Sequence, residues 1–339
     1  MNVYLILGNG FSIDLMHHIK KQDDIALSNL FKNGEKVKWS ADEKSGFLSY
    51  KYTPALWRLG ARPTSSGEET IKIIENILTS TNVFSSLELK KRPTSINNYN
   101  GIYLKAYNEL LAYLRSLFIH YDDEVNITLK KVEAWVWTAF LLSLNNNADV
   151  DKVIIITYNY DVLLERVLRK NKIGFSTYLG DGCTEKFEIY KPHGSISFIH
   201  DITSPIDAFT IRDDFEHEDA EISEFKIRYN KLTCNPKSLP LIPPAGQSSR
   251  YPNSWATKIR TRIVERVKES TNDDIVIISG LSYWSVDREE IDEILVNFNL
   301  DADVSIVNPN PPEDFLSVIT TLFKNVTHYP DSKSIGGLL

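Results

Sequence analysis

Two short polar segments combine residue types that can carry out acid–base chemistry. Residues 157–161 read TYNYD and place the amide of Asn159 two positions before the carboxylate of Asp161. Residues 191–195 read KPHGS and hold His193 between a proline and a glycine. A histidine can accept a proton near neutral pH, and a neutral amide can hold a water molecule or a sugar hydroxyl. These three side chains are therefore candidate catalytic groups for attack by an activated water.

Three further polar segments contain residue types suited to binding a ligand. They are GNGFS at residues 8–12, SGLS at 279–282 and NP at 308–309. Glycines let backbone N–H groups approach a phosphate, and a following helix adds the positive end of its dipole. A tight turn without a ligand is the alternative for the first glycine pair. The candidate binding residues are Gly8, Asn9, Gly10, Phe11, Ser12, Asp14, Thr157, Gly280, Ser282 and Asn308.

Most of these segments directly follow a short, continuously apolar run. Such runs occupy residues 3–7, 153–156 and 275–278, a further strand pattern occupies residues 304–307, and helical patterns lie between them. A continuous apolar run is typical of a strand that is buried on both faces of a parallel sheet. In an open parallel sheet, ligands bind at the edge formed by the carboxyl ends of the strands. The sequence therefore predicts an α/β fold, a Rossmann-like doubly wound parallel sheet, that gathers the polar loops at one edge.

A long segment between the first two strands has a different character. Apolar residues repeat at three- and four-residue steps from Leu104 to Tyr121, and residues 129–144 are apolar nearly all round. This spacing predicts amphipathic and buried helices. We therefore expect residues 31–147 to form a mostly helical insertion or cap. Residues 1–30 and 148–339 would together form the nucleotide-binding domain.

Composition excludes several classes of protein. Lys and Arg total 38 against 45 Asp and Glu, a net charge of −7 that disfavours binding to nucleic acid or an anionic membrane. Two cysteines, Cys183 and Cys234, exclude a disulfide scaffold and a four-cysteine zinc site. The histidines have no metal-ligand spacing, so no metal is expected. No apolar run reaches the roughly 18–20 residues of a membrane span, and no export signal is visible, which predicts a cytoplasmic protein.

Taken in order, the polar segments resemble those of the sirtuin (silent information regulator) family. Residues 8–12 are similar to its first phosphate-binding loop, 157–161 to its threonine-x-asparagine-x-aspartate loop, and 191–195 to its histidine–glycine motif. Residues 280–282 and 307–309 resemble the late loops that hold ribose and adenine. The resemblance covers about residues 1–20 and 150–330. Within the family, residues 241–255 are more similar to bacterial defence-associated members than to the deacetylases.

The resemblance implies that the chain cleaves NAD+ as a substrate, without a cofactor. The four-cysteine zinc module of the deacylases is absent, and DLMHH at residues 14–18 replaces their segment after the first loop. Both departures disfavour a protein deacylase. The implied activity is an NAD+ glycohydrolase that gives nicotinamide and ADP-ribose during antiphage defence, with Asn159, His193 and Asp161 as the catalytic residues. The implied partners are further copies of the chain and a defence protein such as a translocase ATPase.

Several alternatives remain open from the sequence. The chain could instead be a non-catalytic sensor or regulatory subunit that binds NAD or ADP-ribose. Asn159 could cap the helix that follows it. Asp14 is either a charge at a helix start or a ligand contact, with equal weight. A basic stretch from Arg250 to Arg266 is more typical of a solvated helix face than of a partner surface.

Overall fold

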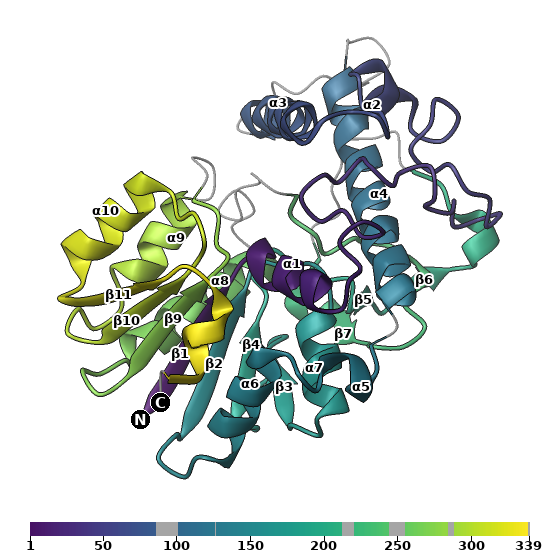
Figure 1. Ribbon diagram of the computed structural model, residues 1–339. Helices are drawn as coiled ribbons and strands as arrows, with labels where there is room; N and C mark the ends of the chain where they lie inside the picture. The colour runs from purple at the N-terminus through teal and green to yellow at the C-terminus, as the bar shows by residue number, and fades with distance from the viewer. Residues whose placement is uncertain (86–100, 126, 212–219, 244–254, 284–287, 338–339) are drawn as a thin grey trace.

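A seven-stranded, wholly parallel sheet forms the centre of the protein (Figure 1). The computed structural model describes residues 1–85, 101–125, 127–211, 220–243, 255–283 and 288–337. The strand order is β11-β10-β9-β1-β2-β4-β3. The strands are β1 (Asn2–Leu7), β2 (Lys152–Thr157), β3 (Phe175–Thr177), β4 (Phe187–Tyr190), β9 (Ile275–Ser279), β10 (Asp303–Val307) and β11 (Asn325–Tyr329). The predicted α/β, doubly wound architecture is confirmed.

Both faces of the central strands are buried, whereas β11 at one edge is largely exposed. This burial explains the apolar runs. In β1, Val3 and Leu5 enter one hydrophobic core, while Tyr4 and Ile6 enter a second core on the opposite face. Successive side chains of a strand point to opposite faces, so a doubly covered strand is apolar at nearly every position. The strand order places β2 on one side of β1 and β9 on the other. The sheet therefore has its topological switch point between β1 and β9.

Helices cover the two faces and complete a three-layer arrangement (Figure 1). Buried residues of α1 (Asn9–His18), α6 (Val136–Asn146) and α7 (Leu163–Lys170) belong to the first core. Those of α8 (Trp255–Lys268), α9 (Arg288–Leu295) and α10 (Glu313–Leu322) belong to the second core. A short 3-10 helix, η6 (Ser332–Gly337), packs beside α6 and brings the end of the described chain back to the first face.

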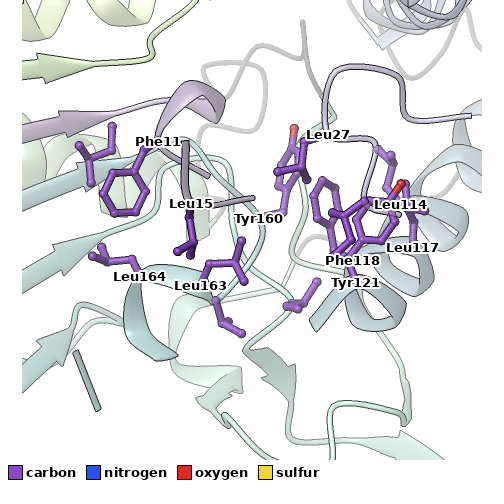
Figure 2. Close-up of a cluster of buried hydrophobic side chains, with 14 of the residues drawn as sticks. Phe11, Leu15, Leu27, Leu114, Leu117, Phe118, Tyr121, Tyr160, Leu163 and Leu164 are labelled. Carbon is purple, nitrogen blue, oxygen red and sulfur yellow. The ribbon is translucent and has the colours of Figure 1, made fainter. Parts of the chain in front are cut away.

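The segment predicted to be a helical insertion contains α2 (Pro54–Arg58), α3 (Gly67–Ser85), α4 (Ile102–Val125) and α5 (Leu129–Val132) before α6. In Figure 1, α2, α3 and much of α4 stand away from the sheet, whereas α6 lies alongside it. The base of α4 shares the first core: Leu114 and Leu117 are buried with Leu15 of α1 and Leu163 of α7 (Figure 2). The helical segment and the sheet are therefore joined by one continuous hydrophobic core.

Smaller elements follow β4. Two antiparallel ladders pair β5 (Phe198–His200) with β7 (Phe225–Ile227) and β6 (Thr203–Ser204) with β8 (Asn235–Pro236). The 3-10 helices η3 (Ile206–Ala208) and η4 (Ile222–Glu224) lie in the same region. Both cysteines are free thiols. Among the helices of the described residues, none combines the length and the apolar character required to cross a membrane.

The shared core predicts that the helical segment and the sheet unfold together. Leu114 is fully buried, so Leu114→Ala should lower the free energy of unfolding by about 2–5 kcal/mol. Leu300 is 41% exposed, and Leu300→Ala is the matched control with an effect below about 1 kcal/mol. Urea denaturation followed by circular dichroism and tryptophan fluorescence should give coincident transitions. A separate, earlier transition of the helical signal in Leu114→Ala would contradict the single core.

Candidate nucleotide site at the carboxyl edge of the sheet

A cavity of about 660 Å³ lies at the carboxyl edge of the sheet, around the switch point. The loops that follow β1, β2, β4, β9, β10 and β11 contribute residues to its wall. Ten of the residues singled out from the sequence line it, namely Gly8, Asn9, Gly10, Asp14, Asn159, Asp161, His193, Gly280, Ser282 and Asn308. Segments far apart in the chain thus meet at one site, as parallel strands with their carboxyl ends at one edge require.

The loops after β1 and β9 touch through their glycines. A Cβ atom on Gly10 would lie 2.5 Å from Gly280 Cα, and one on Gly8 would lie 2.4 Å from Gly280 O. Gly280 also has a φ of +59°, a conformation that favours glycine. The Gly8 and Gly10 N–H groups donate to Ser279 O at 2.9 Å and to Gly280 O at 3.0 Å. The glycines therefore serve first to join the two loops. The Phe11 N–H donates to Gly8 O at 3.1 Å, so the N–H of Asn9 is the donor at the start of α1 that could meet an anion.

Asn159 links the loop after β2 to the loop after β1. Its Nδ2 donates to Gly8 O and to Ser12 Oγ, each at 3.0 Å. Its backbone N–H donates to Thr157 Oγ1 at 3.3 Å. Helix α7 begins later, at Leu163, so Asn159 does not cap it and the capping interpretation is wrong. Because the side-chain N–H groups of Asn159 donate to the protein, its Oδ1 is the atom that can accept a hydrogen bond from a ligand.

Asp161 continues this hydrogen-bond chain. Its Oδ2 accepts from Ser12 Oγ at 2.8 Å, and its Oδ1 accepts from the N–H of Leu163 at 3.0 Å. Burial raises the pKa of the Asp161 carboxyl, although Lys191 and the two hydrogen bonds act to lower it. The two hydrogen bonds that join Asn159 to Ser12 and Ser12 to Asp161 therefore fix the positions of both candidate catalytic groups of this loop.

A buried ion pair holds the loop after β2 in place. Lys191 Nζ donates to Asp161 O at 2.5 Å and to Glu165 Oε1 at 2.8 Å. Both side chains of the ion pair are only 1% exposed. Two buried, opposite charges need each other, because either one alone would be left uncompensated. The pair ties the end of β4, two residues before His193, to the start of α7.

His193 is held in a turn that requires glycine at the next position. Gly194 has a φ of +82°, and a Cβ there would lie 1.8 Å from Pro240 O. The His193 ring is 3% exposed and packs edge-on against the Tyr158 ring, with centroids 4.9 Å apart. Its Nε2 lies 3.7 Å from Glu290 Oε2. His193, Asn159 and Asp161 line the same cavity, so the two polar motifs are brought together as the sequence predicted.

Three predicted binding residues lie outside the cavity wall. Phe11 packs in the core against Trp135 and Trp137, with ring centroids 5.1 Å and 5.0 Å away. Ser12 and Thr157 are buried and take part in the hydrogen bonds that hold Asn159. These side chains support the binding loops and do not line the cavity.

Asp14 lines the cavity but also has protein partners. Its Oδ2 accepts from Trp135 Nε1 at 2.9 Å and from Ser332 Oγ at 3.1 Å. Asp14 lies beyond the first turn of α1, which holds no acidic residue, so the helix-start interpretation is wrong. Its carboxylate joins α1 to the residue before α6 and to η6.

Two further parts of the wall lie outside the predicted motifs. The helical segment contributes apolar residues of α3 and α4, including Ile71, Ile74 and Phe118. The chain after β11 contributes residues 330–332. The apolar spacing of α3 was visible in the sequence, but the surface it contacts was not. No local pattern marked the segment after β11, because only the fold carries it back to α1.

The charge of the wall limits how it can bind an anion. In the part of the chain that the structure describes, the wall carries the carboxylates of Asp14, Glu75, Asp161 and Asp331 and no lysine or arginine. A phosphate there would depend on backbone N–H groups and the α1 dipole. Within the described ranges, no group of three or more His, Cys, Asp or Glu residues could hold a metal ion. Residues 244–254, which include Arg250 and most of the defence-like segment, lie outside the described residues.

The glycine contact predicts a steric effect at Gly10. Gly10→Ala should lower the free energy of unfolding by about 1–3 kcal/mol, because the new methyl group meets the Gly280 backbone. Gly182 is exposed, and a Cβ there meets nothing within 4 Å. Gly182→Ala is therefore the matched control and should unfold at the wild-type urea midpoint. Equal midpoints for the two variants would show that the loops are not in tight contact.

The buried ion pair predicts strong coupling between Lys191 and Glu165. Each of Lys191→Met and Glu165→Leu should cost about 3–5 kcal/mol, because it leaves a buried charge alone. The double variant should regain most of that loss in a double-mutant cycle of urea denaturation. Lys21→Met, at the exposed pair with Asp24, should cost less than about 1 kcal/mol. Additive losses in the double variant would contradict a direct pairing.

No protein-family model matches the chain, and no curated protein sequence matches it. The fold and the geometry of the cavity therefore carry the functional argument, together with the motif resemblance.

Proposed function

We propose that the chain is an NAD+ glycohydrolase that cleaves the nicotinamide–ribose bond to give nicotinamide and ADP-ribose. One observation carries the proposal: Asn159, Asp161 and His193 reach a single cavity at the switch point of a parallel sheet. Nucleotides bind at this position in doubly wound folds. The order of the sirtuin-like motifs supports NAD as the nucleotide.

The chemistry needs few groups. The bond between ribose C1′ and the pyridinium nitrogen breaks, its electron pair leaves with neutral nicotinamide, and C1′ becomes oxocarbenium-like, as in glycoside hydrolysis. A water oxygen then bonds to C1′ while His193 accepts the water proton. Asn159 Oδ1 accepts a hydrogen bond from that water or from a ribose hydroxyl. Asp161 holds this arrangement through Ser12 and stabilises positive charge.

The remaining loops would divide the rest of the substrate between them. The start of α1 offers the backbone N–H of Asn9 and the positive end of the helix dipole to the pyrophosphate. Gly280, Ser282 and Asn308 line the part of the wall formed after β9 and β10, where ribose and adenine would bind. Backbone donors suit this task, because the described wall has no lysine or arginine to pair with the phosphates.

The biological setting follows from the resemblance alone. We place the activity in the cytoplasm, in antiphage defence, where depletion of NAD would halt an infected cell. Self-association, or a partner such as a translocase ATPase, would release the activity on infection. The helical segment from α2 to α4, which stands away from the sheet (Figure 1), is the surface we assign to such contacts.

A non-catalytic NAD or ADP-ribose sensor is the second candidate. The observation that favours it is the extent to which Asn159 and Asp161 are engaged within the protein, through Gly8, Ser12 and Leu163. Such contacts would also suit a rigid binding site that performs no reaction.

Purified protein incubated with NAD, alone and with candidate partners, distinguishes these functions by chromatography of nicotinamide. His193→Ala and Asn159→Ala should each lower the rate of release by about 10²–10⁴-fold. His18 and Asn146 are exposed and outside the cavity wall, so His18→Ala and Asn146→Ala are matched controls that should retain the wild-type rate. Tight NAD binding without release under any condition would favour the sensor. Release that requires an acetylated peptide would favour a deacylase.

A further inference from the structure

Glu290 is a buried carboxylate that helix formation does not explain. It lies in the first turn of α9, beside Glu289, and both acids can interact with the helix dipole. Glu289 is exposed, whereas Glu290 is only 6% exposed. The dipole acts on an exposed acid as well, so it supplies no reason for burial. Burying a carboxylate is costly unless a positive or hydrogen-bonding group compensates it.

Glu290 approaches the candidate base. Its Oε2 lies 3.7 Å from His193 Nε2, and both side chains are almost fully buried. This distance is longer than a hydrogen bond but within the range of an ion pair. Opposite charges so placed attract strongly where water is excluded. The contact joins α9, beyond β9, to the turn after β4, so it spans the switch point.

Within the described residues, the other charged groups near His193 are paired elsewhere. Tyr158, after β2, packs its ring edge-on against the imidazole. Asp161 directs its carboxylate to Ser12 and Leu163, and Lys191 directs its ammonium to Glu165. On the helices behind Glu290, Arg288 pairs with Asp314, and Arg260 of α8 pairs with Glu293.

We propose that Glu290 is a positioning residue that stabilises the protonated form of His193. This inference rests on the proposed role of His193 as the base in NAD hydrolysis. When the water oxygen bonds to C1′, the water proton moves to the imidazole and creates an imidazolium. Glu290 stays ionised, accepts no proton, and offsets the new positive charge, as the carboxylate of a catalytic triad does. Its removal therefore weakens His193 as a base without removing a contact to the substrate.

The test combines a titration with kinetics, using the full chain. NMR of protein labelled with ¹³C-histidine follows the His193 ring, assigned by its absence in His193→Ala. In Glu290→Gln the titration midpoint of His193 should move to lower pH by about one pH unit, because a neighbouring anion favours the charged imidazole. Glu289→Gln removes the same charge from the adjacent, exposed position and should leave the midpoint unchanged.

The kinetic result should follow the titration. In Glu290→Gln, kcat for nicotinamide release should fall about 10–100-fold with little change in KM, and the acidic limb of the pH profile should move to lower pH. Glu290→Asp keeps the charge but shortens the side chain, so its midpoint should fall between those of wild type and Glu290→Gln. This variant also carries the test if Glu290→Gln does not fold.

The outcomes separate the two proposals. An unchanged midpoint in folded Glu290→Gln, or in Glu290→Asp if only that variant folds, would overturn the role of Glu290, whatever the rate. A shifted midpoint in a protein that releases no nicotinamide under any condition would support the pairing and overturn the hydrolase. A lower rate with an unchanged pH profile would reduce Glu290 to a structural residue.

Discussion

The close contact between the glycine loops after β1 and β9 is the constraint on which the site depends. A methyl group at Gly10 or Gly280 would meet the backbone of the opposite loop. Because the strand order reverses at this point, the two loops would otherwise diverge and leave a wider crevice. Their contact forms one side of the cavity wall and fixes the position at which α1 begins. The other groups of the site are arranged around these two loops.

Hydrogen bonds and one ion pair connect these two loops to the candidate catalytic residues. Asn159 is bonded to Gly8 and Ser12, Ser12 is bonded to Asp161, and Lys191 joins the same loop to Glu165. A buried network of this kind restricts the arrangements that its members can adopt. With its polar groups fixed by this network, the site can bind a ligand with little contribution from flexible, charged side chains. The loop after β2 and the turn after β4, joined in this way, can present an amide oxygen and an imidazole to a ligand at fixed positions.

The cavity needs the helical segment as well as the sheet. Residues of α3 and α4 cover its outer side, and the base of α4 is fixed in the core shared with α1 and α7 (Figure 2). The segment after β11 returns to Asp14 and closes another part of the wall. Movement of the helical segment would therefore alter the cavity directly. This connection gives an oligomer or partner contact on those helices a physical route to the proposed active site.

The sequence by itself determined the central strands of the sheet and the loops that could bind a ligand, but not the edge strands β3 and β11. Continuous apolar runs identify doubly buried strands, and the polar motifs stand where those runs end, so their meeting at one edge follows from parallel geometry. The sequence did not determine which side chains face the cavity. Phe11, Ser12 and Thr157 belong to the motifs but point into the protein, whereas Glu290 belongs to no motif and approaches His193. Only tertiary structure decided this, because the direction of a side chain and its distant partners depend on the packing of elements far apart in the chain.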